Sequence, residues 1–191
     1  KMPSKDSDET EDKSDTTQVI GNEILFYGEI SVENILEFIE KFKKLEIELL
    51  KRSADLIDYS PVIRVHIMSE GGDIFSGMNA MNVIERSRVK VITIAQGACC
   101  SAATFMLMGG QERRIGQNAY VLIHQLSTEI WGKFHEIKDE LKSCKKFMKC
   151  IKDLFMGKTE IPEKKFDKLM KKDLYLDAKK CIKYKIVHAI D

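Results

Sequence analysis

Residues 62–85, VIRVHIMSEGGDIFSGMNAMNVIE, decide the fold of this chain. The run Val62–Met68 is rich in β-branched residues and predicts a strand, while Gly71 and Gly72 predict a tight turn directly after it. Ile74–Glu85 then carries apolar residues at helical spacing. The stretch is therefore a complete unit of strand, glycine turn and helix.

Residues 89–108, VKVITIAQGACCSAATFMLM, repeat the same order at once. Val89–Ala95 predicts a second strand, Gln96 and Gly97 predict a turn, and Ser101–Met108 predicts a helix of small and apolar residues. Strands that alternate with helices are typical of parallel β-α units, which right-handed crossovers stack into one core. The predicted fold class is α/β.

Segments on both sides extend this pattern. Glu23–Tyr27 predicts a strand, and Ser31 can cap a helix that runs into the early fifties. Downstream of the core, the sequence predicts a third strand, a long charged helix and two shorter helices, over Tyr120–His124, Lys133–Phe155, 163–171 and 178–184, respectively.

The first residues differ in composition from the rest. Residues 1–18 consist mostly of Ser, Thr, Asp, Glu and Lys, so they bury too little apolar surface to offset the entropy of ordering. We predict a disordered acidic tail over residues 1–18 and one folded domain over residues 19–191. Ordering of the tail against a partner is the alternative.

Composition excludes several classes of protein. The 31 basic residues balance 30 acidic ones, which gives no electrostatic case for binding nucleic acid. No apolar run approaches the roughly 20 residues of a membrane span, and the first residues lack the apolar stretch of a secretory signal. We therefore expect a cytoplasmic protein that binds no membrane.

The cysteines suggest neither a metal site nor a disulfide framework. Cys99, Cys100, Cys144, Cys150 and Cys181 show no CxxC spacing, and a bond between adjacent cysteines would be strained. We expect five reduced thiols, no metal and no small-molecule cofactor.

Ser101 is a candidate nucleophile because it lies where a predicted strand gives way to a helix. Unpaired N–H groups at such a junction favour negative charge. Serine needs a base, and of the four histidines His124 is placed best, at the end of an apolar strand. A strand-end histidine satisfied by the backbone is the alternative, and nothing local distinguishes Asp173 from any other acid.

Other hydrolase patterns fit less well. A Gly-x-Ser-x-Gly elbow around Ser101 needs glycines where Cys99 and Ala103 stand. Cys100 is a conceivable thiol nucleophile, because a helix start lowers a thiol pKa, but adjacent cysteines more often pack as small buried residues. No glycine-rich phosphate loop is present.

Four segments together resemble the proteolytic subunits of Clp proteases. They are the turn Ser69–Gly72, the nucleophile segment Gly97–Leu107, the base segment Tyr120–Gln125 and the acid segment Lys171–Ala178. Their order and spacing agree with the family from about Ile24 to Ile190, which is nearly the whole folded part.

The resemblance implies a spiral, crotonase-like α/β fold and a Ser-His-Asp triad. Ser101 would be the nucleophile, His124 the base and Asp173 the acid that orients it. The backbone N–H groups of Gly72 and Ala102 would form the oxyanion hole. The implied substrate groove contains Gly71, Asp73, Ile74, Gln125 and Leu126.

The resemblance also implies a peptide or unfolded-protein substrate and sevenfold homo-oligomeric rings, two of which stack into a tetradecamer. Glu70 and Leu126 replace prolines of the family pattern, and the stretch 127–132, which helps to join the rings, has one glycine instead of several. Arg64 and His66 stand where the family presents aromatic residues to its ATP-driven unfoldase. These departures leave open whether an unfoldase docks; a peptidase that works without one, as viral relatives do when they process capsid precursors, is the alternative.

Two other hypotheses belong to different classes. A non-catalytic structural subunit would keep the fold without the chemistry, and an acyl-CoA hydratase-like enzyme would use Gly72 as an oxyanion donor but give no reason for the triad. Trp131, Phe134 and Ile137, near the start of the long helix, would either pack on the chain's own core or meet an opposite ring.

Overall fold

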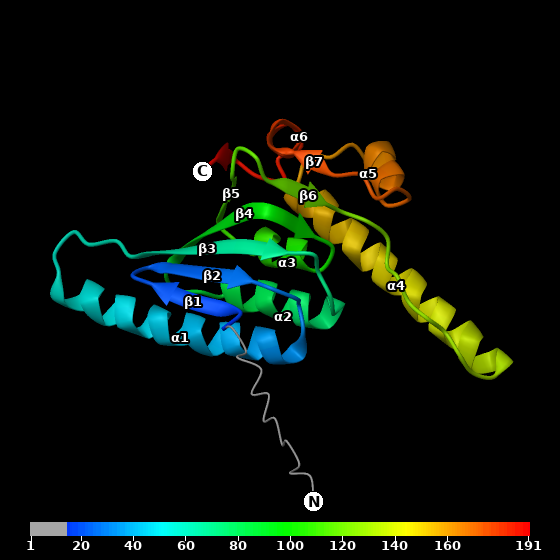
Figure 1. Ribbon diagram of the computed structural model, residues 1–191, viewed down its shortest axis with the longest axis horizontal. Helices are drawn as coiled ribbons and strands as arrows, with labels where there is room; N and C mark the ends of the chain where they lie inside the picture. Colours follow the sequence, from blue (N-terminus) through cyan, green and yellow to red (C-terminus); the bar gives the residue numbers. More distant parts are fainter. Residues whose placement is uncertain (1–14) are drawn as a thin grey trace, which may run out of the picture.

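The computed structural model describes residues 15–191, which form eight strands and six helices (Figure 1). The strands are β1 (Thr17–Ile20), β2 (Glu23–Tyr27), β3 (Val62–Ser69), β4 (Lys90–Cys100), β5 (Glu112–Ile115), β6 (Tyr120–Leu122), β7 (Leu176–Asp177) and β8 (Ala189–Ile190). The helices are α1 (Val32–Asp55), α2 (Ile74–Glu85), α3 (Ala103–Met108), α4 (Phe134–Lys158), α5 (Glu163–Leu169) and α6 (Ala178–Lys183).

One mixed sheet organises the molecule and confirms the predicted α/β class. The strand order is β1-β2-β3-β4-β5-β8, with β6 beside the second half of β4 and β7 beside β6. The strands β2, β3, β4, β5 and β8 run parallel, as the alternation of strands and helices predicts. Among the strands of residues 15–191, β1 pairs with β2 and β7 pairs with β6 in the antiparallel sense, and the other pairings are parallel.

The strand β4 is longer than predicted, because Gln96 and Gly97 form an irregularity within it and not a turn. Ile67 of β3 pairs with Ala95, but Ser69 pairs with Cys99, so the register shifts between them. Gly97 has a φ of +49°, a conformation that favours glycine. Before this point β4 pairs with β5, and after it with β6, so the shift carries the strand end toward a new neighbour.

The folded part begins earlier than residue 19. Thr17 and Gln18, whose composition predicts them as part of the tail, lie in β1, opposite Phe26 and Leu25 of β2. The two residues Gly21 and Asn22 join the strands, and Gly21 has the positive φ of +61° that such hairpin turns require. Residues 1–14 of the predicted tail lie outside the described residues.

Helices α1 and α2 follow the predicted boundaries closely and lie side by side along the sheet (Figure 1). The Ser31 hydroxyl accepts the Asn34 N–H at 3.1 Å and so caps α1 as expected. Phe38 packs edge-on against Phe26 of β2, with ring centroids 6.0 Å apart, and 5.6 Å from Phe42. This aromatic group holds α1 to the core.

Helix α4 is only partly packed. Near its end Ile151 and Phe155 are buried, and the Phe155 ring lies 5.6 Å from Phe166 of α5. Its first half extends away from the sheet, with Phe134 three-quarters exposed. Across residues 15–191, no helix combines the length and the apolar character that a membrane crossing requires.

Candidate active site

The nucleophile candidate occupies a strained turn between β4 and α3. Ser101 has a φ of +52°, a left-handed conformation that costs a residue with a side chain about 1–2 kcal/mol. Two contacts hold it there: its N–H donates to the Leu122 carbonyl at 2.9 Å, and its own carbonyl accepts the Thr104 hydroxyl at 2.6 Å. Strain of this kind collects at functional sites.

The parallel pairing of β4 with β6 brings the base candidate to the same place. Cys100 pairs with Leu122, so Ser101 lies beside the residues that lead to His124. His124 itself stands two residues beyond the end of β6 and not within the strand as predicted. It is half-buried, and it lines a cavity of about 110 Å³ together with Ser101, Gly72 and Ala102.

Within residues 15–191, no hydrogen bond joins the Ser101 hydroxyl to the His124 imidazole. The two side chains share one cavity without that contact in the single chain. Contacts of this kind often tighten only when substrate binds.

The glycine turn supplies unpaired N–H groups to the cavity. Ile30 holds the turn from one side, since its N–H donates to the Gly71 carbonyl at 2.8 Å and its carbonyl accepts the Asp73 N–H at 2.7 Å. The Gly72 N–H lies between these bonds and has no acceptor among the described residues, and the same holds for the Ala102 N–H. Both residues line the cavity beside Ser101, as oxyanion donors must.

Both glycines of the turn are needed for space as well as conformation. A Cβ on Gly72 would lie 2.3 Å from the Ile30 carbonyl oxygen, and one on Gly71 would lie 2.6 Å from the Ser101 Cβ. Their φ angles of +144° and +105° also disfavour any other residue. The turn can approach the nucleophile only because it carries no side chains.

Asp173 is not among the residues that line the cavity. It lies exposed in the loop between α5 and β7, and within residues 15–191 it makes no hydrogen bond to His124. The loop is nevertheless tied to the site, because the Gln125 N–H donates to the Met170 carbonyl at 3.0 Å. The antiparallel pair β6–β7 sets Val121 opposite Leu176.

The expected groove residues are placed unequally. Ile74, Gln125 and Leu126 line the cavity, whereas Gly71 lines a separate hollow with Gly28 and Asp73 caps α2. The Asp73 carboxylate accepts the Ser76 hydroxyl at 2.6 Å, and this hydrogen bond lowers the pKa of Asp73. Asp73 still borders a hollow next to the cavity.

Several lining residues were missed by sequence reasoning. Thr104 and Phe105 come from α3, and Ile151 and Phe155 come from α4. The i, i+4 spacing of Ile151 and Phe155 indicates one helix face, but no local signal connects that face with Ser101. The cavity wall is thus mainly apolar.

Cys100 does not have the properties of a nucleophilic thiol. Burial, followed by the nearby charge of Glu70, raises the pKa of Cys100 to about 12. Burial also holds the pKa of Cys99 well above its ordinary range. Both thiols are therefore protonated near neutral pH, which favours the packing interpretation.

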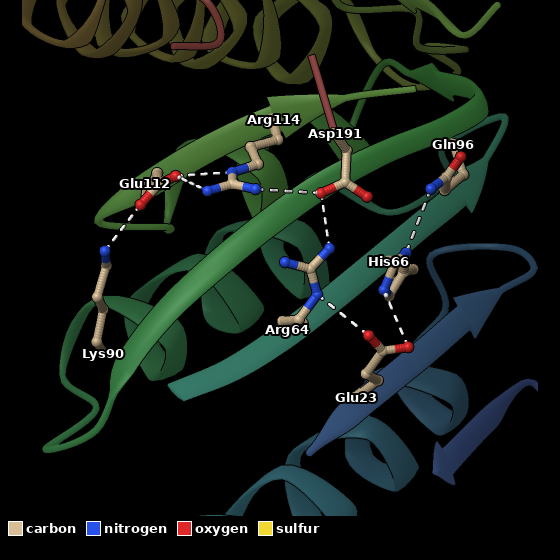
Figure 2. Close-up of polar contacts among 8 residues, drawn as sticks. All are labelled: Glu23, Arg64, His66, Lys90, Gln96, Glu112, Arg114 and Asp191. Atoms are coloured by element: carbon tan, nitrogen blue, oxygen red, sulfur yellow. Dashed lines mark hydrogen bonds and ion pairs between the residues drawn. The ribbon is translucent and has the colours of Figure 1, made fainter. Parts of the chain in front are cut away.

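The face of the sheet that carries Arg64 has a different chemistry, and we call it the outer sheet face. Figure 2 shows its ion pairs: Arg64 contacts Glu23 at 3.1 Å and Asp191 at 2.6 Å, and Asp191 also lies 3.6 Å from Arg114. Arg114 pairs in turn with Glu112. The charged side chains therefore neutralise one another across the three strands β2, β3 and β5 and the last residue.

His66 lies in the same surface and is largely buried. Its Nδ1 lies 3.3 Å from the Gln96 amide nitrogen, and its Nε2 lies 3.5 Å from a Glu23 carboxylate oxygen (Figure 2). Ile92 and Ile94 of β4 stand between these polar residues in the cross-strand register and are buried. Paired charges thus cover Ile92 and Ile94, whereas Tyr27 and Met68, nearer the ends of β2 and β3 on the same face, stay exposed.

Comparison with known proteins agrees with this architecture. The family model for Clp protease matches residues 23–191. The ATP-dependent Clp protease proteolytic subunit 2 of Treponema denticola is 34% identical over 130 residues, which are 67% of this chain and 65% of that relative, slightly less than two thirds of its length. The subunit of the same name from Borreliella burgdorferi is 28% identical over 181 residues, covering 94% of this chain and 87% of the relative.

A solved structure supports the fold independently. A variant of ClpP1 from Listeria monocytogenes superposes with a TM-score of 0.76 at 22% sequence identity, and covers 90% of this chain and 91% of that one. The match between the family model and the sequence spans nearly the whole folded part. The chain therefore belongs to the Clp protease family.

Proposed function

We propose that this chain is a serine endopeptidase in which Ser101 attacks the peptide carbonyl, His124 accepts its proton and Asp173 orients the imidazole. One observation carries the proposal. The N–H groups of Gly72 and Ala102 have no acceptor among the described residues, and both lie beside Ser101 in the cavity that His124 also lines.

The arrangement accounts for each step of acyl transfer. Attack by the Ser101 oxygen moves its proton to His124 and places negative charge on the former carbonyl oxygen. That oxygen accepts hydrogen bonds from the N–H groups of Gly72 and Ala102. In comparable enzymes one such donor stabilises the transition state by about 3–4 kcal/mol. His124 then returns the proton to the leaving amine, and water releases the acyl group.

The strand register supports Asp173 as the acid. Continuing the β6–β7 register by three residues beyond Val121 and Leu176 would set Asp173 opposite His124. The loop 171–175, which carries Asp173, would have to shift for the carboxylate to reach His124. Assembly that orders this loop would complete the triad.

Exposed apolar side chains support a homo-oligomeric ring. Trp131 is fully exposed, Phe134 is 75% exposed, and Ile137 and Leu141 follow on α4. A monomer rarely leaves such a group uncovered. We infer heptameric rings that stack through this region, which light scattering tests against the 21.9 kDa mass of one chain.

The outer sheet face supports a peptidase that works without a docked unfoldase. Paired charges from Arg64, Glu23 and Asp191 cover the strands on which the family presents aromatic residues. An apolar loop inserted there would have to break these pairs. Degradation of short or flexible chains, or processing of a precursor, fits this surface, and the cytoplasmic location stays a prediction.

A fluorophosphonate probe tests the nucleophile directly. We expect the assembled protein to be labelled at Ser101, and the variant Ser101→Ala to be unlabelled although folded. Ser127→Ala is the matched control, because Ser127 also lines the cavity, and it should keep the labelling. Cys100→Ala should keep it too, which separates the serine from the thiol.

The same probe separates the enzyme from a structural subunit. His124→Ala should slow labelling by about 10³-fold or more, and Asp173→Asn should slow it by a smaller factor. A ring that forms normally but never reacts would contradict catalysis and favour a structural subunit.

A further inference from the structure

Charge is distributed unevenly along this nearly neutral chain. Residues 133–185 contain seventeen lysines and nine acidic residues, an excess of eight positive charges. The remaining residues carry an excess of seven negative charges, fourteen basic against twenty-one acidic. The basic part forms α4, α5, α6 and the Asp173 loop, which lie at one end of the sheet (Figure 1).

A groove in this basic part borders the cavity around Ser101 at Gln125. It has a volume of about 430 Å³ and lies between α4 and the end of α5, with Lys149, Phe166 and Lys171 among its lining residues. Gln125 lines both the groove and the catalytic cavity. A peptide that passes over Gln125 therefore runs from Ser101 toward these lysines.

The three lysines that line the groove differ in whether a carboxylate pairs with them. Lys152 pairs with Glu163 at 2.9 Å and with Asp167 at 2.8 Å. Lys149 and Lys171 are exposed, and within the described chain neither makes an ion pair. Two ammonium groups are therefore available to a ligand.

Another border of the cavity carries the opposite charge. A second hollow shares Leu126 and Ser127 with the catalytic cavity and is bordered by Asp73 and Glu140, with no lysine or arginine among its described lining residues. Lysines thus border the cavity beyond Gln125, and carboxylates border it beyond Leu126 and Ser127. Such an asymmetry favours one order of charges in a substrate.

We propose that Lys149 and Lys171 make the enzyme selective for peptides with an acidic side chain on one side of the cleaved bond. The inference rests on the proposed peptidase function and adds the substrate class. The floor of the groove is apolar, since Met148 lines it and Phe166 and Met170 are buried beneath. The preferred segment therefore combines a carboxylate with neighbouring apolar side chains.

Binding to the folded but inactive assembly tests the proposal apart from catalysis. Two labelled peptides of equal composition carry Glu and Lys on opposite sides of one central apolar residue, in either order. On Ser101→Ala, fluorescence anisotropy should show that one order binds about tenfold more tightly. In 0.5 M NaCl the difference should fall to about threefold or less.

The double variant Lys149→Glu/Lys171→Glu in the same background should abolish or reverse this ratio. The matched control is Lys44→Glu/Lys51→Glu, which makes the same change of charge on exposed residues of α1 and should leave the ratio unchanged. Equal affinities for the two orders, or equal effects of the two double variants, would overturn the proposal.

Cleavage of a positional peptide series gives a second readout. With active enzyme, Glu should raise kcat/KM over Lys by about tenfold at one or two neighbouring positions on one side only. Preference for Glu on both sides of the cleaved bond would reflect the general positive charge of residues 133–185. It would contradict the proposed selection by Lys149 and Lys171. Failure to cleave any peptide would contradict the proposed function and leave the binding result to decide this proposal.

Discussion

The cavity around Ser101 and the outer sheet face are built on the same strands, β3 and β4, yet they rely on different interactions. The cavity consists of small neutral groups, namely the Gly72 and Ala102 backbones and the Ser101 side chain. The outer sheet face consists of long charged side chains such as Arg64 and Arg114 (Figure 2). The properties of the cavity depend on the positions of backbone groups. Those of the outer sheet face depend on ion pairs that water and salt ions can replace.

This difference has a direct energetic consequence. No side chain can replace the hydrogen bonds that backbone N–H groups donate into a cavity. A displacement of the backbone by about 1 Å therefore removes the stabilisation that these donors give. Exposed ion pairs contribute about 0–1 kcal/mol each and are readily exchanged. We therefore expect substitutions near the cavity to have large effects and substitutions on the outer sheet face to have small ones.

The largest effect should come from Gly72→Ala. The new Cβ would lie 2.3 Å from the Ile30 carbonyl oxygen, so the turn must move and carry the Gly72 N–H with it. We expect fluorophosphonate labelling to slow by about 100-fold or more, and the free energy of unfolding to fall by about 2–4 kcal/mol.

Gly157→Ala is the control for this change, because a Cβ on Gly157 meets nothing within 4 Å. Gly157 lies in α4, where alanine is the better helix former, so stability should be unchanged or slightly higher. A Gly72→Ala protein that reacts at the normal rate would disprove the oxyanion role of the turn.

Arg113 and Arg114 are adjacent residues of β5 that point to opposite faces of the sheet, so they allow a direct comparison of buried and exposed polar contacts. Arg113 is buried and donates to the carbonyls of Ile186 at 2.8 Å, Lys158 at 2.9 Å and Lys185 at 3.0 Å. Arg114 lies on the outer sheet face and pairs with carboxylates only.

Arg113→Met should therefore destabilise the protein by about 3 kcal/mol, since it leaves the buried Ile186 carbonyl and the partly buried Lys158 and Lys185 carbonyls without this donor. For a domain of this size that loss lowers Tm by about 6–12 °C. Arg114→Met should cost less than about 1 kcal/mol, and 0.5 M NaCl should reduce that cost. Equal losses for both variants in thermal unfolding would contradict the distinction between the two faces.

The same contrast explains how much of the fold the sequence predicts. Helices α1 and α2 and strand β3 were predicted almost to the residue, because their apolar spacing and caps are local signals. Strand β5 was missed, since Glu112 and Arg114 make it look like a polar turn. Its existence depends on pairing with β4 and β8, which no local pattern contains.

At Gly97 a local pattern gives a wrong prediction, because it indicates a turn where the strand continues. Glycine after a strand ordinarily predicts a turn, but here it lets β4 change neighbours and continue to Cys100. Ser101 and His124 could be proposed from their places at strand ends, and the cavity they share agrees with that reasoning. Asp173 could be proposed only from the family resemblance, since it follows two lysines and has no local distinction.

The smallest difference is expected between a buried carboxylate, Glu46, and a partly exposed one on the outer sheet face, Glu112. Acid titration can measure what each contributes to the free energy of unfolding. Glu46 is 5% exposed; although burial opposes its ionisation, hydrogen bonds from Lys43, the Arg88 N–H and Ser87 lower its pKa. Glu112 on the outer sheet face is 25% exposed, and its hydrogen bond with Lys90 is the largest cause of its lowered pKa.

A carboxylate whose pKa is lower in the folded state stabilises the protein above its unfolded value, here 4.5, and the stabilisation is lost as the pH falls through the folded value. Glu46→Gln should lower the free energy of unfolding by about 1 kcal/mol at pH 7, and the difference from the unsubstituted protein should vanish toward pH 3. Glu112→Gln should follow the same course with a smaller loss, because solvent already screens that pair. Urea titrations at pH 7, 5, 4 and 3 measure both. If the curve of Glu46→Gln ran parallel to that of the unsubstituted protein at every pH, the ionised Glu46 carboxylate would contribute nothing to holding α1 against the start of β4.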